Sequence, residues 1–347
     1  MDDELAHKLT FRWSDYRSLT QDLPGTGGLL RLELPDFCVE ELPVYLPQGK
    51  GSHTYAWIEK RGLSTRDLVL ALMQEGLKEQ QIGVAGLKDK HAITKQWISV
   101  PNKFAKAMEK LESLEGVKIL ELSRHKNKLG MGHLKGNRFT VRVRQAPEID
   151  NARRILEVLQ SVGVPNYFGP QRFGNGGLNA VDGYKVLYGL QAPGGHRLKG
   201  LFISSVQSLF FNHVLSQRIE ADLFNTVILG DWAKKHDTGG EFLVEEISEG
   251  ERAKRFEISS ILPLYGKRVK VAEALAGEFE QKALEYLQLS WVKFASRRGD
   301  RRLSRFPLQE VSLEATEDGY VVSFDLPKGA FATSILRELL KTEVDAS

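Results

Sequence analysis

Apolar and polar residues alternate along short stretches in the first third of the chain, and this pattern predicts β-strands. The stretch "LLRLEL" places Leu30, Leu32 and Leu34 on one face. The stretch "HTYAWIEK" at 53–60 alternates in the same way. Both are expected to form half-buried strands.

A charged turn separates the next two predicted strands. The apolar stretch "IGVAG" at 82–86 leads into Lys88, Asp89 and Lys90, and "TKQWISV" at 94–100 leads out of them. A solvated turn explains the charges, whereas a catalytic carboxylate explains both the charges and the apolar approach. Neighbouring cations favour the ionised form of a carboxylate and lower its pKa, which would keep Asp89 available as a nucleophile.

Two stretches in the same third of the chain have helical spacing. In "STRDLVLALMQEGL", Ser64 is expected to cap the helix with Asp67 three residues later, and Leu68 and Leu72 share a face. The second predicted helix covers "KFAKAMEKLESLEG", with apolar residues at positions 104, 108, 111 and 114.

The stretch "GNRFTVRVR" at 136–144 predicts a strand with two different faces. One face carries Phe139, Val141 and Val143, and the other carries Thr140 among three arginines. Such a strand suits a sheet floor under an RNA backbone. The alternative is an exposed face whose charges only keep it soluble.

The composition of the chain changes near Gly163. The stretch 163–177 is dense in glycine, proline and aromatic residues, and a long helical pattern follows at 201–222. Strand patterning returns only after Arg305, in "YVVSFDL", and the helical pattern "ATSILRELLK" comes next. We therefore expect an α+β protein in which one domain, 1–162 with 306–347, is interrupted by a more helical inserted domain at 163–305.

Composition places the chain among ordinary globular proteins, with 347 residues, 41% hydrophobic and 27% charged. A single cysteine, Cys38, excludes an internal disulfide framework and fits a reducing compartment. The N-terminus has no basic start followed by an apolar stretch, and the apolar runs are too short to span a bilayer. We expect a cytoplasmic protein with no membrane association.

Charge is unevenly distributed, although the net charge is only +3. Residues 118–144 contain eight Lys or Arg against one acid, and "SRRGDRRLSR" at 296–305 contains five arginines and one aspartate. Such segregation suggests basic patches that face a polyanion, with ordinary solvated surfaces as the alternative. On the first interpretation the arginines of 296–305 contact phosphates.

Because the sequence lacks the common motifs for metals, phosphate loops and nucleophile elbows, a carboxylate is the leading candidate for a catalytic group. The eight histidines and the single cysteine show no metal-ligand spacing, the glycine-rich stretches lack a phosphate-loop pattern, and no nucleophile elbow is present. We therefore expect neither a metal nor an organic cofactor.

Four motifs then resemble one known family. "AGLKDKHA" at 85–92, "LKGNRF" at 134–139, "GVPNYFGPQRFG" at 163–174 and "GAFATSILRE" at 329–338 occur in the order seen in the TruD family of tRNA pseudouridine synthases. The resemblance runs from about Leu30 to the C-terminus.

The resemblance implies an enzyme that converts one uridine in tRNA, position 13 for this family, to pseudouridine. It also implies a pseudouridine-synthase catalytic domain with a mixed or antiparallel sheet, interrupted by an inserted TRUD domain. Matching the motifs residue by residue gives Asp89 as the catalytic aspartate and Phe37, Asn137 and Phe331 as substrate-binding residues. Phe139 is either a further stacking ring or a core residue.

The implied partner is tRNA, and no protein partner is implied. We expect Lys88 and Lys90 to point away from Asp89 towards backbone phosphates, and a closer cation from elsewhere in the fold to pair with its carboxylate. The rival hypothesis is a non-catalytic RNA-binding protein or RNA chaperone that uses the same basic faces.

Overall fold

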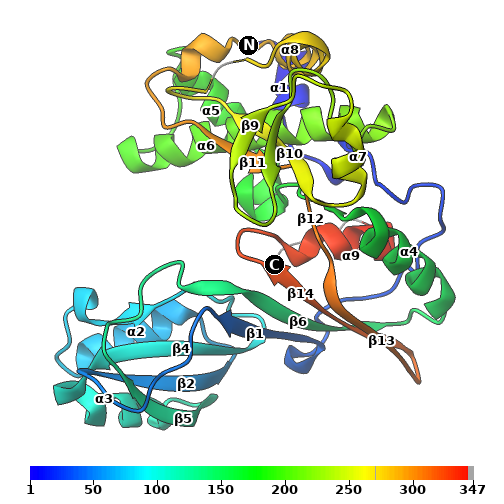
Figure 1. The fold of residues 1–347 in the computed structure, drawn as a ribbon. Coiled ribbons are helices and arrows are strands. Elements are labelled where there is room, and N and C mark those ends of the chain that lie inside the picture. The colour runs from blue at the N-terminus through cyan, green and yellow to red at the C-terminus, as the bar shows by residue number, and fades with distance from the viewer. Residues whose placement is uncertain (270, 343–347) are drawn as a thin grey trace. The chain divides into compact units, whose positions relative to one another are not determined.

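The structure is a computed structural model, drawn in Figure 1, and it describes residues 1–269 and 271–342. Residues 270 and 343–347, which fall within the predicted inserted domain and the predicted catalytic domain, lie outside the described residues.

The chain forms two compact units. The first unit contains Met1–Gly25, Arg154–Pro307 and the segment that begins at Phe331; the second contains Thr26–Arg153 and Leu308–Ala330. These limits differ from the predicted domain limits because both chain ends pack with the middle of the chain. The two compact units are defined by packing, whereas the predicted insertion is defined by the order of domains along the chain. The units therefore do not test the insertion at 163–305, which stays a prediction.

The second unit is built on an eight-stranded sheet. Seven strands follow the order β13-β14-β6-β1-β4-β2-β5, and β3 pairs with β4. The β1–β4 pair is parallel and the other pairs are antiparallel, so the predicted mixed sheet is confirmed. The strands are β1 (Phe37–Pro43), β2 (His53–Arg61), β3 (Gly83–Val84), β4 (Ile93–Pro101), β5 (Val117–His125), β6 (Leu134–Arg144), β13 (Gln309–Thr316) and β14 (Gly319–Pro327).

Helix α2 (Thr65–Gln74) and the short α3 (Ala105–Glu109) pack against this sheet. Ser64 caps α2 and forms the predicted capping box with Asp67. The apolar core between helices and sheet includes Ile58, Leu68, Leu72, Ile98 and Met108. Removing these side chains from water is the main stabilising contribution, at about 25 cal/mol per Å² of apolar surface.

The expected strand at 30–34 is absent. Residues 30–33 are irregular and a 3₁₀ turn at Leu34–Asp36 leads into β1. Leu32 and Leu34 are 56% and 39% exposed, and Arg31 has φ of 56°, a left-handed conformation that breaks an extended chain. The alternation of leucines at 30–34 therefore did not reflect a buried face. The strands predicted from 53–60, 94–100 and 136–144 are confirmed as β2, β4 and β6.

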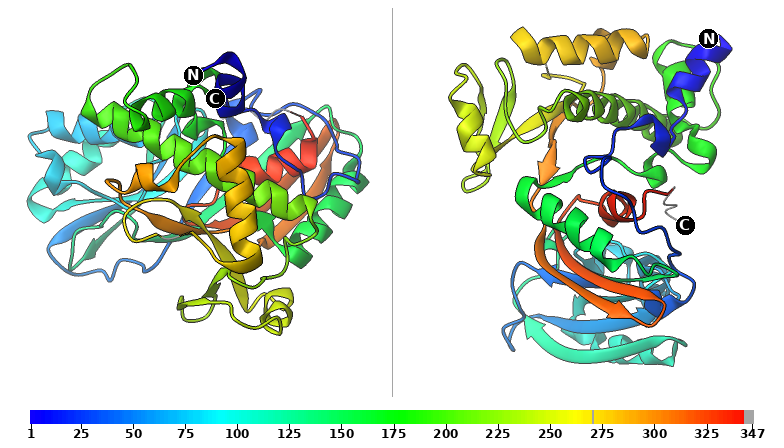
Figure 2. Two further views of the ribbon diagram at one scale, coloured as in Figure 1. Left: turned by 90° about the horizontal axis from the view of Figure 1, so that it is seen from above. Right: turned by 90° about the vertical axis from the view of Figure 1, so that its right-hand side faces the viewer.

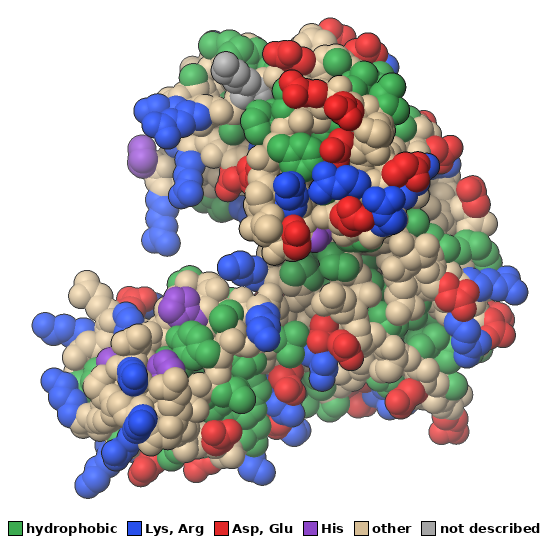
Figure 3. Space-filling model, viewed as in Figure 1, with side chains coloured by type: hydrophobic (Ala, Val, Ile, Leu, Met, Phe, Trp, Pro, Cys, Tyr) green, Lys and Arg blue, Asp and Glu red, His purple; other side chains and the backbone are tan. Residues whose placement is uncertain are grey.

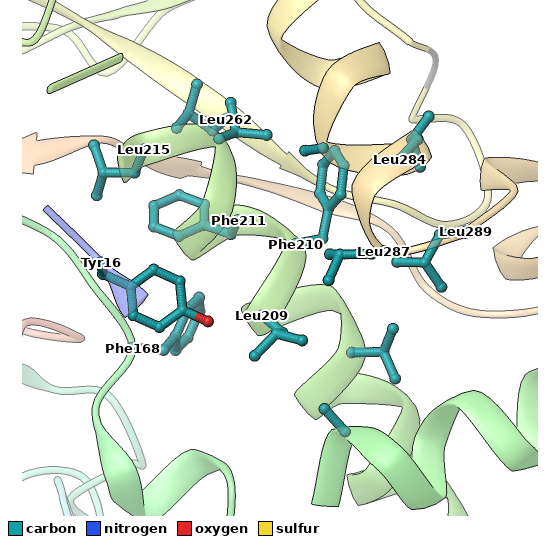
Figure 4. Packing of buried hydrophobic residues seen from close by; sticks show 14 of the residues in the cluster. Tyr16, Phe168, Leu209, Phe210, Phe211, Leu215, Leu262, Leu284, Leu287 and Leu289 are labelled. Atoms are coloured by element: carbon teal, nitrogen blue, oxygen red, sulfur yellow. The ribbon is translucent and has the colours of Figure 1, made fainter. Parts of the chain in front are cut away.

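The core of the first unit surrounds the long helix α6 (His196–Glu220), and Figure 4 shows Phe210 and Phe211 of this helix among leucines from neighbouring elements. Helix α5 (Asn179–Leu187) lies beside α6 in Figures 1 and 2. The other helices are α1 (Asp3–Leu9), α7 (Glu249–Lys254), α8 (Ala274–Tyr286) and α9 (Ala332–Leu340), and α4 (Ile149–Val162) crosses from one unit to the other.

The first unit also contains strands that the sequence pattern did not predict. A four-stranded sheet has the order β11-β10-β8-β9, and β12 pairs with β7. All six strands precede residue 307, so the expectation that strand patterning returns only after Arg305 is wrong. Buried strands such as β10 show no alternation that a sequence pattern could reveal. The strands are β7 (Val164–Pro165), β8 (Trp232–Lys235), β9 (Glu241–Leu243), β10 (Ile258–Leu264), β11 (Asp300–Leu303) and β12 (Arg305–Phe306). The α+β class is confirmed.

Candidate functional site

Asp89 lies on an open turn between β3 and β4 of the second unit. Its side chain is exposed, whereas Lys88 immediately before it is buried. The apolar approach, the turn and the following strand agree with the sequence prediction.

Two buried side chains hold the backbone of this turn. Thr65, the first residue of α2, accepts a hydrogen bond from the Lys88 amide through its Oγ1 at 2.8 Å. The fully buried Lys60 donates from Nζ to the Asp89 carbonyl at 2.9 Å and also to the carbonyl of Leu63. Burial lowers the pKa of Lys60 to about 8, and the Asp89 charge opposes that shift. The main chain at Asp89 is therefore fixed while its carboxylate faces outward.

Lys88 does not point towards solvent, so the prediction that it reaches backbone phosphates is wrong. Its Nζ lies 3.2 Å from Oε2 of Glu41 on β1, and both side chains are almost fully buried. Burial raises the pKa of Glu41, and the Lys88 charge opposes that rise. A buried lysine needs a partner, and Glu41 supplies one from an inward position of the neighbouring strand. Lys90 is exposed, and its orientation towards backbone phosphates stays a prediction.

Arg31, like Lys60, is a cation from elsewhere in the fold whose charge interacts with that of Asp89. Its Cζ lies 4.1 Å from the centroid of the Phe37 ring, which is cation–π geometry. Burial lowers the pKa of Arg31, and Asp89 opposes the shift. An arginine remains protonated in proteins, so the charge of Arg31 that interacts with Asp89 is positive.

Phe37 begins β1 and is only 2% exposed. Its ring meets the Phe139 ring edge-on at 6.0 Å, and Phe139 in turn stacks on Phe324 at 5.8 Å. Phe139 is half-buried, so it supports Phe37 as part of this aromatic row. Phe37 therefore contacts Arg31, a residue whose charge interacts with that of Asp89.

Asn137 lies on β6 opposite Glu41 of β1, on the face of the sheet that also carries Phe37. Its Oδ1 is buried and, among residues 1–269 and 271–342, has no hydrogen-bond partner. A buried oxygen without a donor is costly, so Asn137 is equipped to accept a hydrogen bond from a bound group.

Phe331 belongs to the first unit, where it precedes α9. Its ring lies 6.4 Å from that of Phe168 and 5.7 Å from Cζ of Arg302. Phe168 comes from the "NYFGPQRFG" motif, and Arg172 of the same motif also lies over the Phe168 ring, at 5.2 Å. The motif therefore builds the surroundings of Phe331 within this unit.

The predicted phosphate contacts at 296–305 are wrong for two of the five arginines. Arg305 is buried, lies 4.2 Å from the Phe256 ring and donates to the carbonyl of Val162 at 2.7 Å. Arg302 lies 4.2 Å from the Phe168 ring and donates to the Asn166 carbonyl. Burial lowers the pKa of Arg305 to about 10 and that of Arg302 to about 9, with Arg172 contributing to the latter. These two arginines have structural roles.

The arginines of β6 are also partly neutralised. A carboxylate lies within 3.0 Å of each one: Arg138 pairs with Asp325, Arg142 with Asp318 and Arg144 with Asp36. Ion pairs across neighbouring elements explain this row of charges without an RNA ligand.

Sequence reasoning missed Arg31 and Lys60 as members of the site. Lys60 left a signal, since it shares the inward face of β2 with Ala56 and Ile58, where a charged residue needs a specific partner. Arg31 left no signal in the pattern, because its position depends on a left-handed backbone conformation.

A search of residues 1–269 and 271–342 finds no cluster of three His, Cys, Asp or Glu side chains placed to hold a metal ion. In the same residues, every helix is too short or too polar to cross a lipid bilayer.

The mixed sheet, the aspartate turn and the four motifs place the chain in the class of pseudouridine synthases. The model of the family described as tRNA pseudouridine synthase D (TruD) matches residues 14–182 and 195–339. The chain belongs to the TruD family.

Individual relatives agree with this assignment. The chain is 50% identical over 337 residues to tRNA pseudouridine synthase D of Thermus thermophilus, covering 96% of this chain and 95% of the relative. It is 42% identical over 344 residues to tRNA pseudouridine synthase D of Anaeromyxobacter dehalogenans, covering 96% and 98%. A crystal structure of the putative tRNA pseudouridine synthase D from Methanosarcina mazei has the same fold, with a TM-score of 0.78, 23% identity and 98% of each chain covered.

Proposed function

We propose that this chain converts a uridine of tRNA, the one at position 13, to pseudouridine. Membership of the TruD family supports the reaction and the substrate. The observation that carries the proposal is Asp89 itself, an exposed carboxylate on a turn whose backbone is held by the buried side chains of Lys60 and Thr65. The charge of Arg31 interacts with that of Asp89.

The proposed reaction is an isomerisation. The bond between N1 of uracil and C1′ of the ribose breaks, the base turns, and C5 bonds to C1′ while C5 loses a proton and N1 gains one. No electrons are gained or lost overall, so a single carboxylate can start the reaction. Asp89 either attacks C1′ or removes a proton from the sugar, and in both cases Arg31 contributes a positive charge that interacts with that of Asp89.

The detached base must be retained while it turns. The target uridine first leaves its stack at a cost of a few kcal/mol, and stacking on an aromatic ring returns about 1–3 kcal/mol per base. We assign this stacking to Phe37 and Phe331. Asn137 is assigned to a hydrogen bond from the nucleotide, since its buried Oδ1 lacks a donor among the described residues; orienting the catalytic loop is the other role open to it.

Neither a metal nor an organic cofactor is required by this chemistry. We propose that chelation leaves the modification rate unchanged once the tRNA has been folded, because Mg²⁺ can act by folding the RNA. The same proposal places the protein in the cytoplasm, where tRNA is found and the free thiol of Cys38 persists.

The test is mass-spectrometric mapping of pseudouridine in unmodified tRNA incubated with the pure protein. Product at position 13 supports the proposal. Product at another uridine corrects the position, and tight binding without product favours the rival class, a non-catalytic RNA-binding protein or RNA chaperone.

A further inference from the structure

Neighbouring arginines on β11 point in opposite directions. Successive side chains of a strand alternate between the two faces of its sheet. Arg302 accordingly lies against Phe168 and Phe211 in the core, whereas Arg301 lies 5.1 Å from the Trp232 ring of β8. Within the arginine-rich segment, Arg302 therefore has a structural role, whereas Arg301 faces a cavity.

The cavity has a volume of about 920 Å³ and lies within the first unit. Trp232 and short apolar residues of the loop before α8 form part of its wall. Among the residues that the structure describes, five cationic ones also line it: Lys267, Arg268, Arg297, Arg298 and Arg301. Figure 3 shows blue side chains gathered over this edge of the unit, near the loop that leads into β11 (orange in Figure 1).

The carboxylates of the wall do not balance these cations. The acids that line the cavity within residues 1–269 and 271–342 are Glu241, Glu273 and Asp300. Glu241 already pairs with Lys234, which lies 3.0 Å away and is not part of the wall. Asp300 accepts a hydrogen bond from the Arg301 amide at 2.8 Å. Positive charge therefore exceeds negative charge around the cavity.

Two of the cationic side chains are held in position. Arg301 lies over Trp232, and burial lowers its pKa while Glu280 opposes the shift. Arg297 donates to the Gly200 carbonyl of α6 at 3.3 Å. Arginines whose orientation is already fixed lose less entropy when they bind a phosphate, and their planar groups match its oxygens.

We propose that this cavity binds backbone phosphates of the tRNA, at a place separate from the target uridine. Its volume is at the upper end of the range for ligand-sized sites, which accommodates a nucleotide. The proposal rests on tRNA being the substrate and adds a second RNA-binding site, contributed by the first unit alone.

The experiment compares two double variants with equal loss of charge. Lys267→Gln with Arg298→Gln changes two exposed cations of the cavity wall. Lys254→Gln with Arg255→Gln changes two exposed cations at the end of α7, outside the wall. Affinity for unmodified tRNA is measured over a range of salt concentrations, and single-turnover product formation is measured at saturating tRNA.

The cavity variant is expected to bind tRNA about tenfold more weakly. The slope of log K against log salt is expected to flatten by about 0.7 to 0.9 for each phosphate that the variant no longer neutralises. The control variant is expected to keep the wild-type affinity and slope, and both variants are expected to keep the wild-type rate at saturation.

If the two variants have the same tRNA affinity and the same salt dependence, this inference is wrong. The ligand of the cavity would then be sought among acidic protein segments. Failure of the proposed function gives a different result, because wild-type protein would then form no pseudouridine. A slower rate at saturation in the cavity variant alone would also contradict a site separate from the reacting uridine.

Discussion

The guanidinium of Arg31 lies 4.1 Å from the centroid of the Phe37 ring, and its charge interacts with that of Asp89. One side chain thus touches a ring assigned to the base and acts on the carboxylate assigned to the chemistry. Arg31 reaches this position through a left-handed backbone conformation, which is uncommon for a residue with a side chain and concentrates at functional sites.

Removing the charge of Arg31 should slow pseudouridine formation. We expect Arg31→Gln to lower the single-turnover rate on the order of 10- to 100-fold, because the variant lacks a positive charge that interacts with Asp89 at the candidate site. Arg31→Lys should recover part of the rate, since the charge returns without the planar stack on Phe37. Arg66→Gln, an exposed arginine paired with Glu79, serves as the control and should react normally.

Shortening the Phe37 ring should affect turnover more than affinity, since most affinity comes from phosphates. Phe37 is buried, so Phe37→Ala would also leave a cavity; Phe37→Leu removes the aromatic face with a smaller loss of volume. We expect a rate roughly 5- to 150-fold lower at saturating tRNA, which corresponds to the loss of one base–ring stack. A folded Phe37→Leu protein with the wild-type rate would remove the ring from the mechanism.

The Lys88–Glu41 pair should stabilise the turn only as a pair. Lys88→Met leaves a buried carboxylate without its cation and should lower the free energy of unfolding by about 3–5 kcal/mol. Adding Glu41→Gln removes that charge while keeping an acceptor for the Trp97 amide, so the double variant should be more stable than Lys88→Met. Chemical denaturation measures both, with exposed Lys90→Met as the control within about 0.5 kcal/mol of wild type. If the double variant is no more stable than the single one, the buried pair does not act as a unit.

Lys60 should make stability depend on pH in a defined window. Its pKa is about 8 in the folded protein, against an ordinary value of 10.5, so between these values the unfolded chain binds more protons. The contribution of Lys60 to the free energy of unfolding should therefore rise with pH through that window, by up to about 1.4 kcal/mol per pH unit, and be smallest below pH 8. Denaturation of wild type and Lys60→Met at several pH values tests this. If the free energies of unfolding of wild type and Lys60→Met change in parallel with pH, Lys60 titrates at its ordinary value and this prediction is wrong.

The sequence predicted elements whose patterns reflect local rules. The capping box of Ser64 and Asp67 predicted α2, and the alternation around Val141 predicted β6. The stretch at 30–34 failed because alternation says nothing about which face a larger fold covers, and Leu32 is mostly exposed. The prediction that Lys88 points outward failed because of a buried ion pair. Lys88 takes an inward position because Glu41, on a strand distant in the sequence, supplies its partner.

The sequence motifs named the candidate site residues, but they did not name the side chains that support those residues. Asp89 and Phe37 came from motifs; in the structure, Arg31 lies over the Phe37 ring and its charge interacts with that of Asp89. Lys60 was readable as a lysine on an apolar face, whereas Arg31 depends on a backbone conformation that no local pattern encodes.

The central claim is that the Asp89 carboxylate starts the reaction. Asp89 is exposed, and the backbone of its turn is held by Lys60 at the Asp89 carbonyl and by Thr65 at the Lys88 amide, so Asp89→Asn should leave the fold unchanged. The substitution keeps size and shape but removes the negative charge, and with it the nucleophile or base. Affinity for tRNA should stay the same or improve slightly, because the variant no longer repels a nearby phosphate.

The most direct measurement determines tRNA affinity and pseudouridine yield together for purified Asp89→Asn. The account predicts no detectable pseudouridine at an affinity equal to or slightly tighter than that of wild type. Appreciable product from Asp89→Asn, with wild-type affinity, would contradict the catalytic assignment and leave Asp89 as a residue of a solvated turn.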